Sequence, residues 1–436
     1  MRVITWMSRR GVTLGLVAAV SVCAAGGCEK GAYIAHILGG QLALQGRVVP
    51  IADVLASGQL TAEQAAKLQL IVEVRQFAID AIGLVAGDSY TTFYDTNGNA
   101  LAFNLSASRK DALEPFVWQF PFVGSMPYIG FFDYEYARSV QDGLVDAGYD
   151  TVLYEVDAYS TLGIFADPVR SPMLERSEIS LIDTVIHELL HNTIWRANDT
   201  EFNESLATFV AREGTLQFIR SKYGDASELL VEAETNYADL GLIHGFLLDL
   251  FGRLDAYYAQ PLSSENKIAG REAVYQAARE RFTGEVLPQL LDPDRYAPLA
   301  DLPTNNAWML GNRRYNLDLD LFGAVFAATG ESWAETLDVF RLATGQDEPK
   351  AFLRQWLLER GIAPPAKPRN ARPLPQAEAL DAYPILTVPG PVPRLGDEPL
   401  YPCCPAVFVR VDDSCRAKEL QPVPISEPGV PAPTSP

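Results

Sequence analysis

Two histidines that flank a glutamate constrain this 436-residue chain more than any other sequence feature. They form the motif His187-Glu188-Leu189-Leu190-His191, and the chain has only four histidines in all. On a helix, residues three and four positions apart share a face, so both imidazoles and Glu188 would project together. Two imidazoles placed in this way can reach one zinc ion. The motif therefore predicts a helix that carries two ligands of a metal site. The capping-box spacing of Ser180 and Asp183 predicts that this helix starts one to two turns before the ligands.

A third ligand is expected from the segment that follows. Glu204 comes thirteen residues after His191, in Phe202-Asn203-Glu204-Ser205, where a second amphipathic helix begins. The intervening Asn198-Asp199-Thr200 provides turn and capping residues, which allow the second helix to fold back against the first. Glu204 would then complete a His2Glu site with an open position for water.

Other acids are candidates for the same role. Asp199 and Glu201 lie in the connecting loop and stay open as alternative ligands, whereas Glu213 lies too far along the second helix. A metzincin would need glycine three residues after the second histidine and histidine or aspartate six residues after it. Ile194 and Ala197 occupy those positions, which excludes that arrangement.

An open metal position predicts hydrolysis. Zinc lowers the pKa of a bound water, and Glu188, which is not a ligand, can take its proton and pass it to the leaving amine. The developing oxyanion needs a further donor, for which Tyr315 is the first choice. His36 and His244 have apolar sequence neighbours and are expected to be structural rather than ligands.

The order of predicted elements favours an α+β fold. Thr61 to Gln64 resembles a capping box that opens a helix to about Leu84. Tyr90 to Ser106 alternates around Asp95-Thr96-Asn97-Gly98, which predicts a hairpin. A helix over 134–146, a strand over 151–156 and nearly continuous helices from Ser177 complete the pattern. We expect a predominantly helical domain with a small sheet before the metal-binding helix.

The N-terminal segment is typical of an exported protein. Three arginines precede an apolar stretch from Val12 to Ala25, and Ala25-Gly26-Gly27-Cys28 resembles a bacterial lipobox, with Ala25 where leucine is usual. We expect residues 1–27 to be a lipoprotein signal peptide and Cys28 to carry the lipid that anchors the protein to a membrane. Glu29 favours the outer membrane, facing the periplasm of a bacterial envelope.

Residues 364–436 form a proline-rich C-terminal tail, which is expected to be mostly irregular. Cys403, Cys404 and Cys415 lie there, and one disulfide from either neighbouring cysteine to Cys415 is expected in an oxidising compartment. Between the signal peptide and this tail, we expect an N-terminal α+β part, 28–176, and a helical part with the metal site, 177–363.

The formal charge excludes one class of partner. The chain has 35 lysines and arginines against 55 aspartates and glutamates, a net charge of -20. Such a protein repels phosphate backbones, so nucleic acid is not expected as a ligand. A hydrophobic content of 48% is enough to bury a large core.

The combination of the His-Glu-x-x-His motif with Asn203-Glu204 resembles the gluzincin zinc peptidases. The succession of 158–163, Asp167-Pro168, the metal motif and 202–205 is similar to a bacterial family of lipoprotein aminopeptidases, over most of residues 30–345. The resemblance implies a zincin-like fold, one zinc ion held by His187, His191 and Glu204, and Glu188 as catalytic acid and base. It further implies that the strand before the zinc helix binds the substrate backbone. Residues implied in substrate binding are Tyr159, Ser160, Thr161, Gly163 and Asn305.

Two features depart from related families. Thr208 stands where thermolysin-like members have an aspartate that orients a ligand histidine, so that support must come from elsewhere. No Gly-x-Met-Glu-Asn motif is present to bind a free α-amine, which leaves Glu155, Asp157 and Asp167 as candidates. The resulting hypothesis is a zinc aminopeptidase that acts on peptides or proteins. The alternatives are a zinc endopeptidase and a catalytically silent peptide-binding protein of the envelope.

Overall fold

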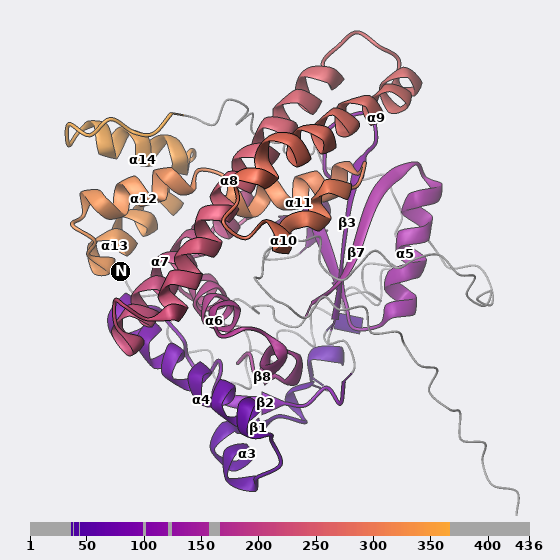
Figure 1. Cartoon of the computed structure of the whole chain (residues 1–436). Helices are drawn as coiled ribbons and strands as arrows, with labels where there is room; N and C mark the ends of the chain where they lie inside the picture. Colours follow the sequence, from indigo (N-terminus) through magenta and orange to yellow (C-terminus); the bar gives the residue numbers. More distant parts are fainter. Residues whose placement is uncertain are drawn as a thin grey trace, which may run out of the picture.

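A computed structural model describes residues 36–37, 39–42, 44–98, 102–120, 124–156 and 166–366. Helices predominate in these residues, and small sheets precede the helix that carries the two histidines (Figure 1). The expected fold class, α+β and predominantly helical, is confirmed. None of the described helices is long and apolar enough to cross a membrane.

Several predictions fall on residues outside this described part of the chain. They concern the signal peptide and lipid site, the expected substrate-binding strand and nearly all of the tail: 1–27, Cys28, Tyr159, Ser160, Thr161, Gly163, Cys403, Cys404 and Cys415.

Two helices, α3 (Ile51–Ser57) and α4 (Ala62–Phe77), lie in the N-terminal part of the described chain. Thr61 Oγ1 accepts a hydrogen bond from the Gln64 N–H at 3.1 Å, and Gln64 Oε1 accepts one from the Thr61 N–H at 3.2 Å. This reciprocal pair confirms the capping box predicted at Thr61. The helix continues as a π-helical segment, Ala78–Ile82, and ends at Gly83, whose φ of 86° is left-handed.

The largest sheet is antiparallel, in the order β6 (Tyr128–Phe131), β3 (Ala102–Arg109), β7 (Tyr149–Val156). Helix α5 (Tyr134–Asp146) has the predicted bounds and lies on one face of it, whereas α11 (Asn306–Asn316) lies on the other (Figure 1). Alternation along β7 explains this arrangement. Leu153 belongs to the cluster that includes α5, and its neighbour Val152 packs against the cluster that includes α11.

The predicted hairpin around Asp95 to Gly98 is wrong in its pairing. Asn97 and Gly98 do have positive φ angles of 53° and 78°, as a turn requires. However, β2 (Thr92–Tyr94) pairs with β1 (Val49–Pro50) and β8 (Val169–Arg170), whereas β3 belongs to the larger sheet. The long register between β3 and β7 places β3 in a different sheet, which sequence alternation alone could not reveal.

The remaining elements are a short hairpin, β4 (Trp118–Phe120) and β5 (Gly124–Met126), and the helices after β8. The first two of these helices, α6 (Glu178–Thr193) and α7 (Thr200–Tyr223), carry the predicted ligands. The others are α8 (Glu228–Tyr258), α9 (Ser264–Arg281), α10 (Pro293–Tyr296), α12 (Leu319–Ala328), α13 (Trp333–Thr344) and α14 (Pro349–Leu358).

Helices α6 and α7 pack antiparallel. Glu204 near the start of α7 contacts His191 near the end of α6, whereas the Tyr223 hydroxyl at the end of α7 donates to Glu178 at the start of α6. Between them, Gly214 lies so close to α6 that a Cβ there would come within 3.1 Å of Ile186. The absence of a side chain therefore permits the close approach of the two helices.

Helix α6 begins after Ser177, where the helical pattern was expected to start, but its capping residue differs from the prediction. Ser177, not Ser180, is the capping residue, and its hydroxyl accepts the Ser180 N–H at 3.3 Å. Ser180 lies inside the helix and is buried. The helix thus begins three residues earlier than the spacing of Ser180 and Asp183 indicated, whereas Asp199 caps α7 as expected.

Asn203 fixes the turn between these helices. Its side-chain nitrogen donates to the Arg196 carbonyl at 2.7 Å, and its side-chain oxygen accepts the Arg196 N–H at 2.9 Å. Asn203 is 2% exposed, so both backbone groups of Arg196 depend on it rather than on water. The residue before Glu204 therefore has a structural function, which is to set the angle at which α7 returns.

We predict that Asn203→Ala lowers the free energy of unfolding by about 2 kcal/mol, because two buried backbone groups lose their partners. Chemical denaturation measures this change. Asn266→Ala on exposed α9 is the matched control and should change stability by less than about 0.5 kcal/mol. Equal stability of Asn203→Ala and the native chain would contradict the role of Asn203 in holding the turn.

Candidate metal centre

The three side chains predicted to be ligands place a nitrogen or oxygen atom within contact distance of one another. His187 Nε2 is 3.1 Å from Glu204 Oε2 and 3.2 Å from His191 Nε2, and His191 Nε2 is 3.4 Å from Glu204 Oε2. Ligand atoms that are about 2.0 to 2.1 Å from a tetrahedral zinc ion are about 3.3 to 3.4 Å apart. The three side chains therefore fit three corners of such a site, and this buried group could hold a metal ion.

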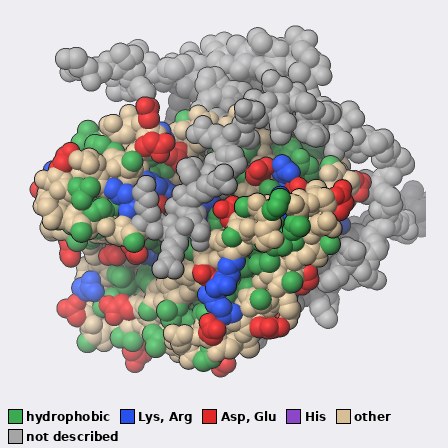
Figure 2. Space-filling view, turned by 90° about the horizontal axis from the view of Figure 1, so that it is seen from above, with side chains coloured by type: hydrophobic (Ala, Val, Ile, Leu, Met, Phe, Trp, Pro, Cys, Tyr) green, Lys and Arg blue, Asp and Glu red, His purple; other side chains and the backbone are tan. Residues whose placement is uncertain are grey.

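The apolar residues of α6 place these side chains. Its two imidazoles point towards α7, while the expected hydrophobic residues are buried around them: Leu181, Ile182, Val185, Ile186, Leu189 and Leu190. His187, His191 and Glu204 are only 8%, 6% and 4% exposed. Figure 2 shows no histidine on the face that it presents, in agreement with this burial.

The electrostatics of the group favour a cation. Burial by itself would raise the pKa of Glu204, but the charge of His191 and hydrogen bonds from both imidazoles outweigh it and hold that pKa well below its usual range. Burial likewise disfavours the charged form of His191, yet Glu204 raises the pKa of that imidazole. The carboxylate thus attracts positive charge to the position between the three ligand atoms.

Glu188 lies beside this group on the same helix and is 6% exposed. Its charge contributes to the upward pKa shifts of His191 and Tyr128, so its carboxylate lies near the ligand group. Among the described residues, the group that can hold a metal does not include it. This is the arrangement that a general base next to the ligands requires.

Two tyrosines from different elements border the ligands. The Tyr315 ring, at the end of α11, lies 6.1 Å from the His187 ring between centroids. The Tyr128 hydroxyl, at the start of β6, donates to Glu204 Oε1 at 3.5 Å. Burial and the charge of Glu204 raise both tyrosine pKa values well above 10, so both hydroxyls stay protonated as possible donors.

Sequence reasoning identified Tyr315 but missed Tyr128. The available signal was the alternation in β6, where Ile129 and Phe131 enter the core beside α5. Tyr128 must then point to the opposite face, where α11 lies. Without the register of β6 against β3, that face could not be connected with the metal motif.

The acids considered as alternative ligands have other partners. Asp199 caps α7 and lies 3.3 Å from Arg196. Glu201 forms ion pairs with Lys350 at 3.0 Å and Arg313 at 3.3 Å. Neither belongs to the described group of possible ligands, and neither does Glu213.

Asn305 lies away from the ligands. It caps α11, accepting the Trp308 N–H at 3.0 Å and donating to the Thr151 carbonyl at 2.9 Å. Tyr315 is ten residues further along the same helix, a distance of about 15 Å. The described contacts of Asn305 join α11 to β7, and its role in substrate binding stays a prediction.

Ser205 connects the ligand helix to the other end of α11. Its hydroxyl donates to the Arg314 carbonyl at 2.9 Å and accepts the Leu317 N–H at 3.2 Å. The serine that follows Glu204 therefore holds the backbone on both sides of Tyr315. The three consecutive residues therefore have separate functions. Asn203 holds the turn, Glu204 is a candidate ligand, and Ser205 links α7 to α11.

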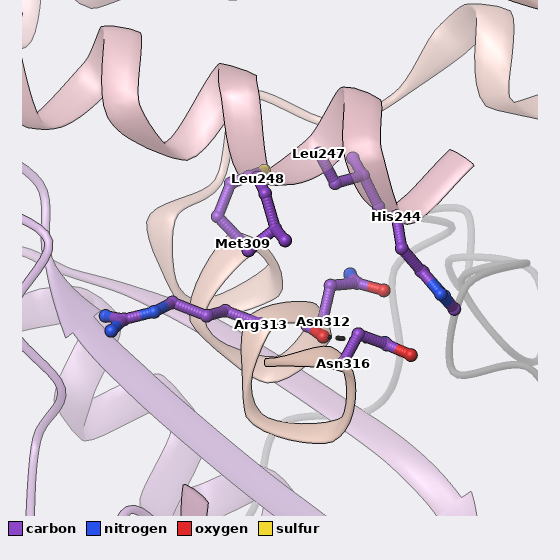
Figure 3. Close-up of a pocket in the computed structure, with 7 residues that line it drawn as sticks. All are labelled: His244, Leu247, Leu248, Met309, Asn312, Arg313 and Asn316. Carbon is purple, nitrogen blue, oxygen red and sulfur yellow. Dashed lines mark hydrogen bonds between the residues drawn. The ribbon is translucent and has the colours of Figure 1, made fainter. Parts of the chain in front are cut away.

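The two remaining histidines lie apart from the group. His36 Nε2 accepts the Phe132 N–H at 3.2 Å. His244 belongs to α8 and lines a small cavity between α8 and α11 with Met309, Asn312 and others (Figure 3). Burial and the charge of Arg212 lower the pKa of His244 well below its ordinary value, so it is neutral there.

Support for the second ligand histidine is incomplete among the described residues. His191 Nδ1 is buried and has no hydrogen-bond partner there. The Trp195 ring packs edge-on against His191, 5.5 Å away between centroids. Within the described part of the chain, the His191 ring is thus packed against an aromatic side chain, and no carboxylate accepts a hydrogen bond from its Nδ1 atom.

Candidates for binding a free amine are placed as follows. Glu155 lies in β7 opposite Phe103, and Asp157 falls outside the described residues. Asp167 is buried, and its backbone contacts Ser89 and Tyr90. Their part in substrate recognition stays a prediction.

Comparison with known proteins supports the class of enzyme. No curated protein and no solved structure matches the chain. The profile of one protein family matches residues 32–352, which include the sheets and every residue of the candidate metal centre. By this match over most of its length, the chain belongs to the Aminopep family, described as "Putative aminopeptidase".

Proposed function

We propose that this protein is a zinc-dependent peptidase of the gluzincin type. The observation that carries the proposal is the mutual contact of His187 Nε2, His191 Nε2 and Glu204 Oε2 at 3.1 to 3.4 Å in a buried site. Membership of an aminopeptidase family supports peptide or protein as the substrate. Two imidazoles and one carboxylate are a donor set that suits zinc in hydrolytic enzymes.

Each residue has a defined role in the proposed reaction. His187, His191 and Glu204 would hold one zinc ion, which supplies Lewis-acid polarisation of the scissile carbonyl and activation of water. Glu188 accepts the proton from the attacking water and delivers it to the leaving amine. Tyr315, which is held protonated, can donate to the oxyanion as it develops, and Tyr128 can do so if its hydroxyl turns away from Glu204.

We further propose that the enzyme removes N-terminal residues and is anchored by a lipid on Cys28 to the bacterial outer membrane, facing the periplasm. The family supports the first point and the lipobox resemblance supports the second. The acidic charge of the chain supports the absence of a nucleic-acid partner.

Replacing Glu204 tests the assignment of the ligands. Glu204→Gln should remove most of the bound zinc, because it replaces the one anionic ligand, and it should abolish the rise in thermal midpoint that zinc gives the native chain. Elemental analysis after dialysis measures the zinc content. Glu201→Gln is the matched control and should retain zinc; the reverse pattern would identify Glu201 as the ligand instead.

The second prediction concerns the general base. Glu188→Gln should retain zinc and the native thermal midpoint, yet lower kcat by about 100-fold or more, because the proton acceptor is lost. Glu178→Gln, on the exposed start of the same helix, is the control and should leave kcat unchanged. Undiminished turnover by metal-loaded Glu188→Gln would refute the assignment.

The third prediction separates exopeptidase from endopeptidase activity. A chromogenic aminoacyl substrate with a free amine should be hydrolysed at least about tenfold faster than its N-acetylated form, since an aminopeptidase recognises the charged amine. Preferential cleavage of internal bonds in blocked peptides would instead favour the endopeptidase. Mass spectrometry of the products identifies the bond that is cleaved.

A further inference from the structure

We propose that Arg314 binds the free α-carboxylate of short peptides, so that the site acts on di- and tripeptides. This inference rests on the proposed peptidase function and specifies its substrate class. It starts from a guanidinium that is buried next to the candidate metal centre and that contacts no carboxylate of the described residues.

Arg314 is 5% exposed on α11. Its Nη1 atom is buried and has no hydrogen-bond partner, and no ion pair to Arg314 is present among the described residues. The guanidinium carbon lies 4.9 Å from the centre of the Tyr128 ring, a cation–π contact that offsets only part of the cost of burying a charge.

Several arginines of this protein that are buried or largely covered contact carboxylates. Arg271 makes two hydrogen bonds to Asp150, at 2.6 and 2.9 Å, and Arg354 makes one to Asp318 at 2.8 Å. Arg313, the neighbour of Arg314, lies 3.3 Å from Glu201. Arg176, which is also buried, donates to the Ser180 and Thr184 hydroxyls instead. Among the described residues, neither a carboxylate nor a hydroxyl accepts a hydrogen bond from the Arg314 guanidinium, so a ligand can take that place.

The position of Arg314 is suited to a substrate. The Tyr128 hydroxyl donates to Glu204, so the guanidinium is separated from a candidate metal ligand by one aromatic ring. The charge of Arg314 lowers the pKa values of Tyr128 and Tyr315, whereas the charge of Glu204 raises them. Arg314 therefore lies near the same two tyrosines as Glu204. Ser205 fixes the Arg314 backbone to α7, which keeps this spacing constant.

The charges of the site identify the class of ligand. A divalent cation would be balanced by the carboxylates of Glu204 and Glu188, which leaves the positive charge of Arg314 uncompensated. A carboxylate would neutralise it and can accept two parallel hydrogen bonds from a guanidinium, whereas a carbonyl supplies only a dipole. A peptide carboxylate can lie this close to the scissile bond only when few residues follow that bond.

The test combines a substrate change with a variant. For the zinc-loaded native protein, conversion of dipeptides to their C-terminal amides should lower kcat/KM by about 10- to 100-fold, chiefly through KM. Arg314→Gln should cause a similar loss for the free acids and little further loss for the amides. Arg341→Gln, which removes an exposed arginine from α13, is the control and should retain the preference for the acid.

Two measurements distinguish carboxylate binding by Arg314 from a purely structural role of its side chain. Arg314→Gln should keep or raise the thermal midpoint, because it removes an unpaired buried charge, whereas loss of a structural arginine would lower it. Calorimetric titration of zinc-loaded Glu188→Gln with a dipeptide and its amide tests carboxylate recognition even without turnover. Equal kcat/KM values and equal affinities for the acid and the amide would overturn the inference. Failure to hydrolyse any peptide would overturn the proposed function alone.

Discussion

The antiparallel packing of α6 against α7 is the constraint on which the site depends. Helix α6 supplies two of the three candidate ligand atoms, and the third lies beside them because the chain reverses within the turn from Ile194 to Asp199. Asn203 holds that turn by its two hydrogen bonds to Arg196. Gly214 allows the same two helices to stay close further along. The geometry of the ligands is thus a result of helix packing rather than of a flexible loop, which keeps them preorganised for a metal.

The second wall of the site comes from the sheet and from α11. β6 contributes Tyr128, and the end of α11 contributes Arg314 and Tyr315, so a hydrogen-bond donor and a positive charge face the acidic ligand side. Ser205 couples this wall to α7 through the backbone on both sides of Tyr315. Changes at Ser205 would therefore disturb the position of Tyr315 without removing a candidate ligand.

The sequence allowed prediction of what depends on local spacing. The helical period brought His187, Glu188 and His191 to one face, and the capping residue Asp199 indicated where the return helix begins. The α+β class and the bounds of α5 also followed from local patterns. The hairpin at 95–98 was wrong because strand partners are chosen by long-range register, and β3 pairs with β7 over eight positions. Tyr128 was missed for a related reason: its approach to Glu204, and the contact of Arg314 with its ring, depend on how a sheet face and a distant helix pack, which no spacing in the chain records.

The claim that two imidazoles and Glu204 share one divalent cation can be tested most directly by anomalous diffraction from crystals grown with zinc, with data collected on both sides of the zinc absorption edge. The account predicts one anomalous peak within about 2.0 to 2.2 Å of His187 Nε2, His191 Nε2 and a Glu204 carboxylate oxygen. A peak elsewhere, or none between these three atoms at full zinc occupancy of the sample, would contradict it.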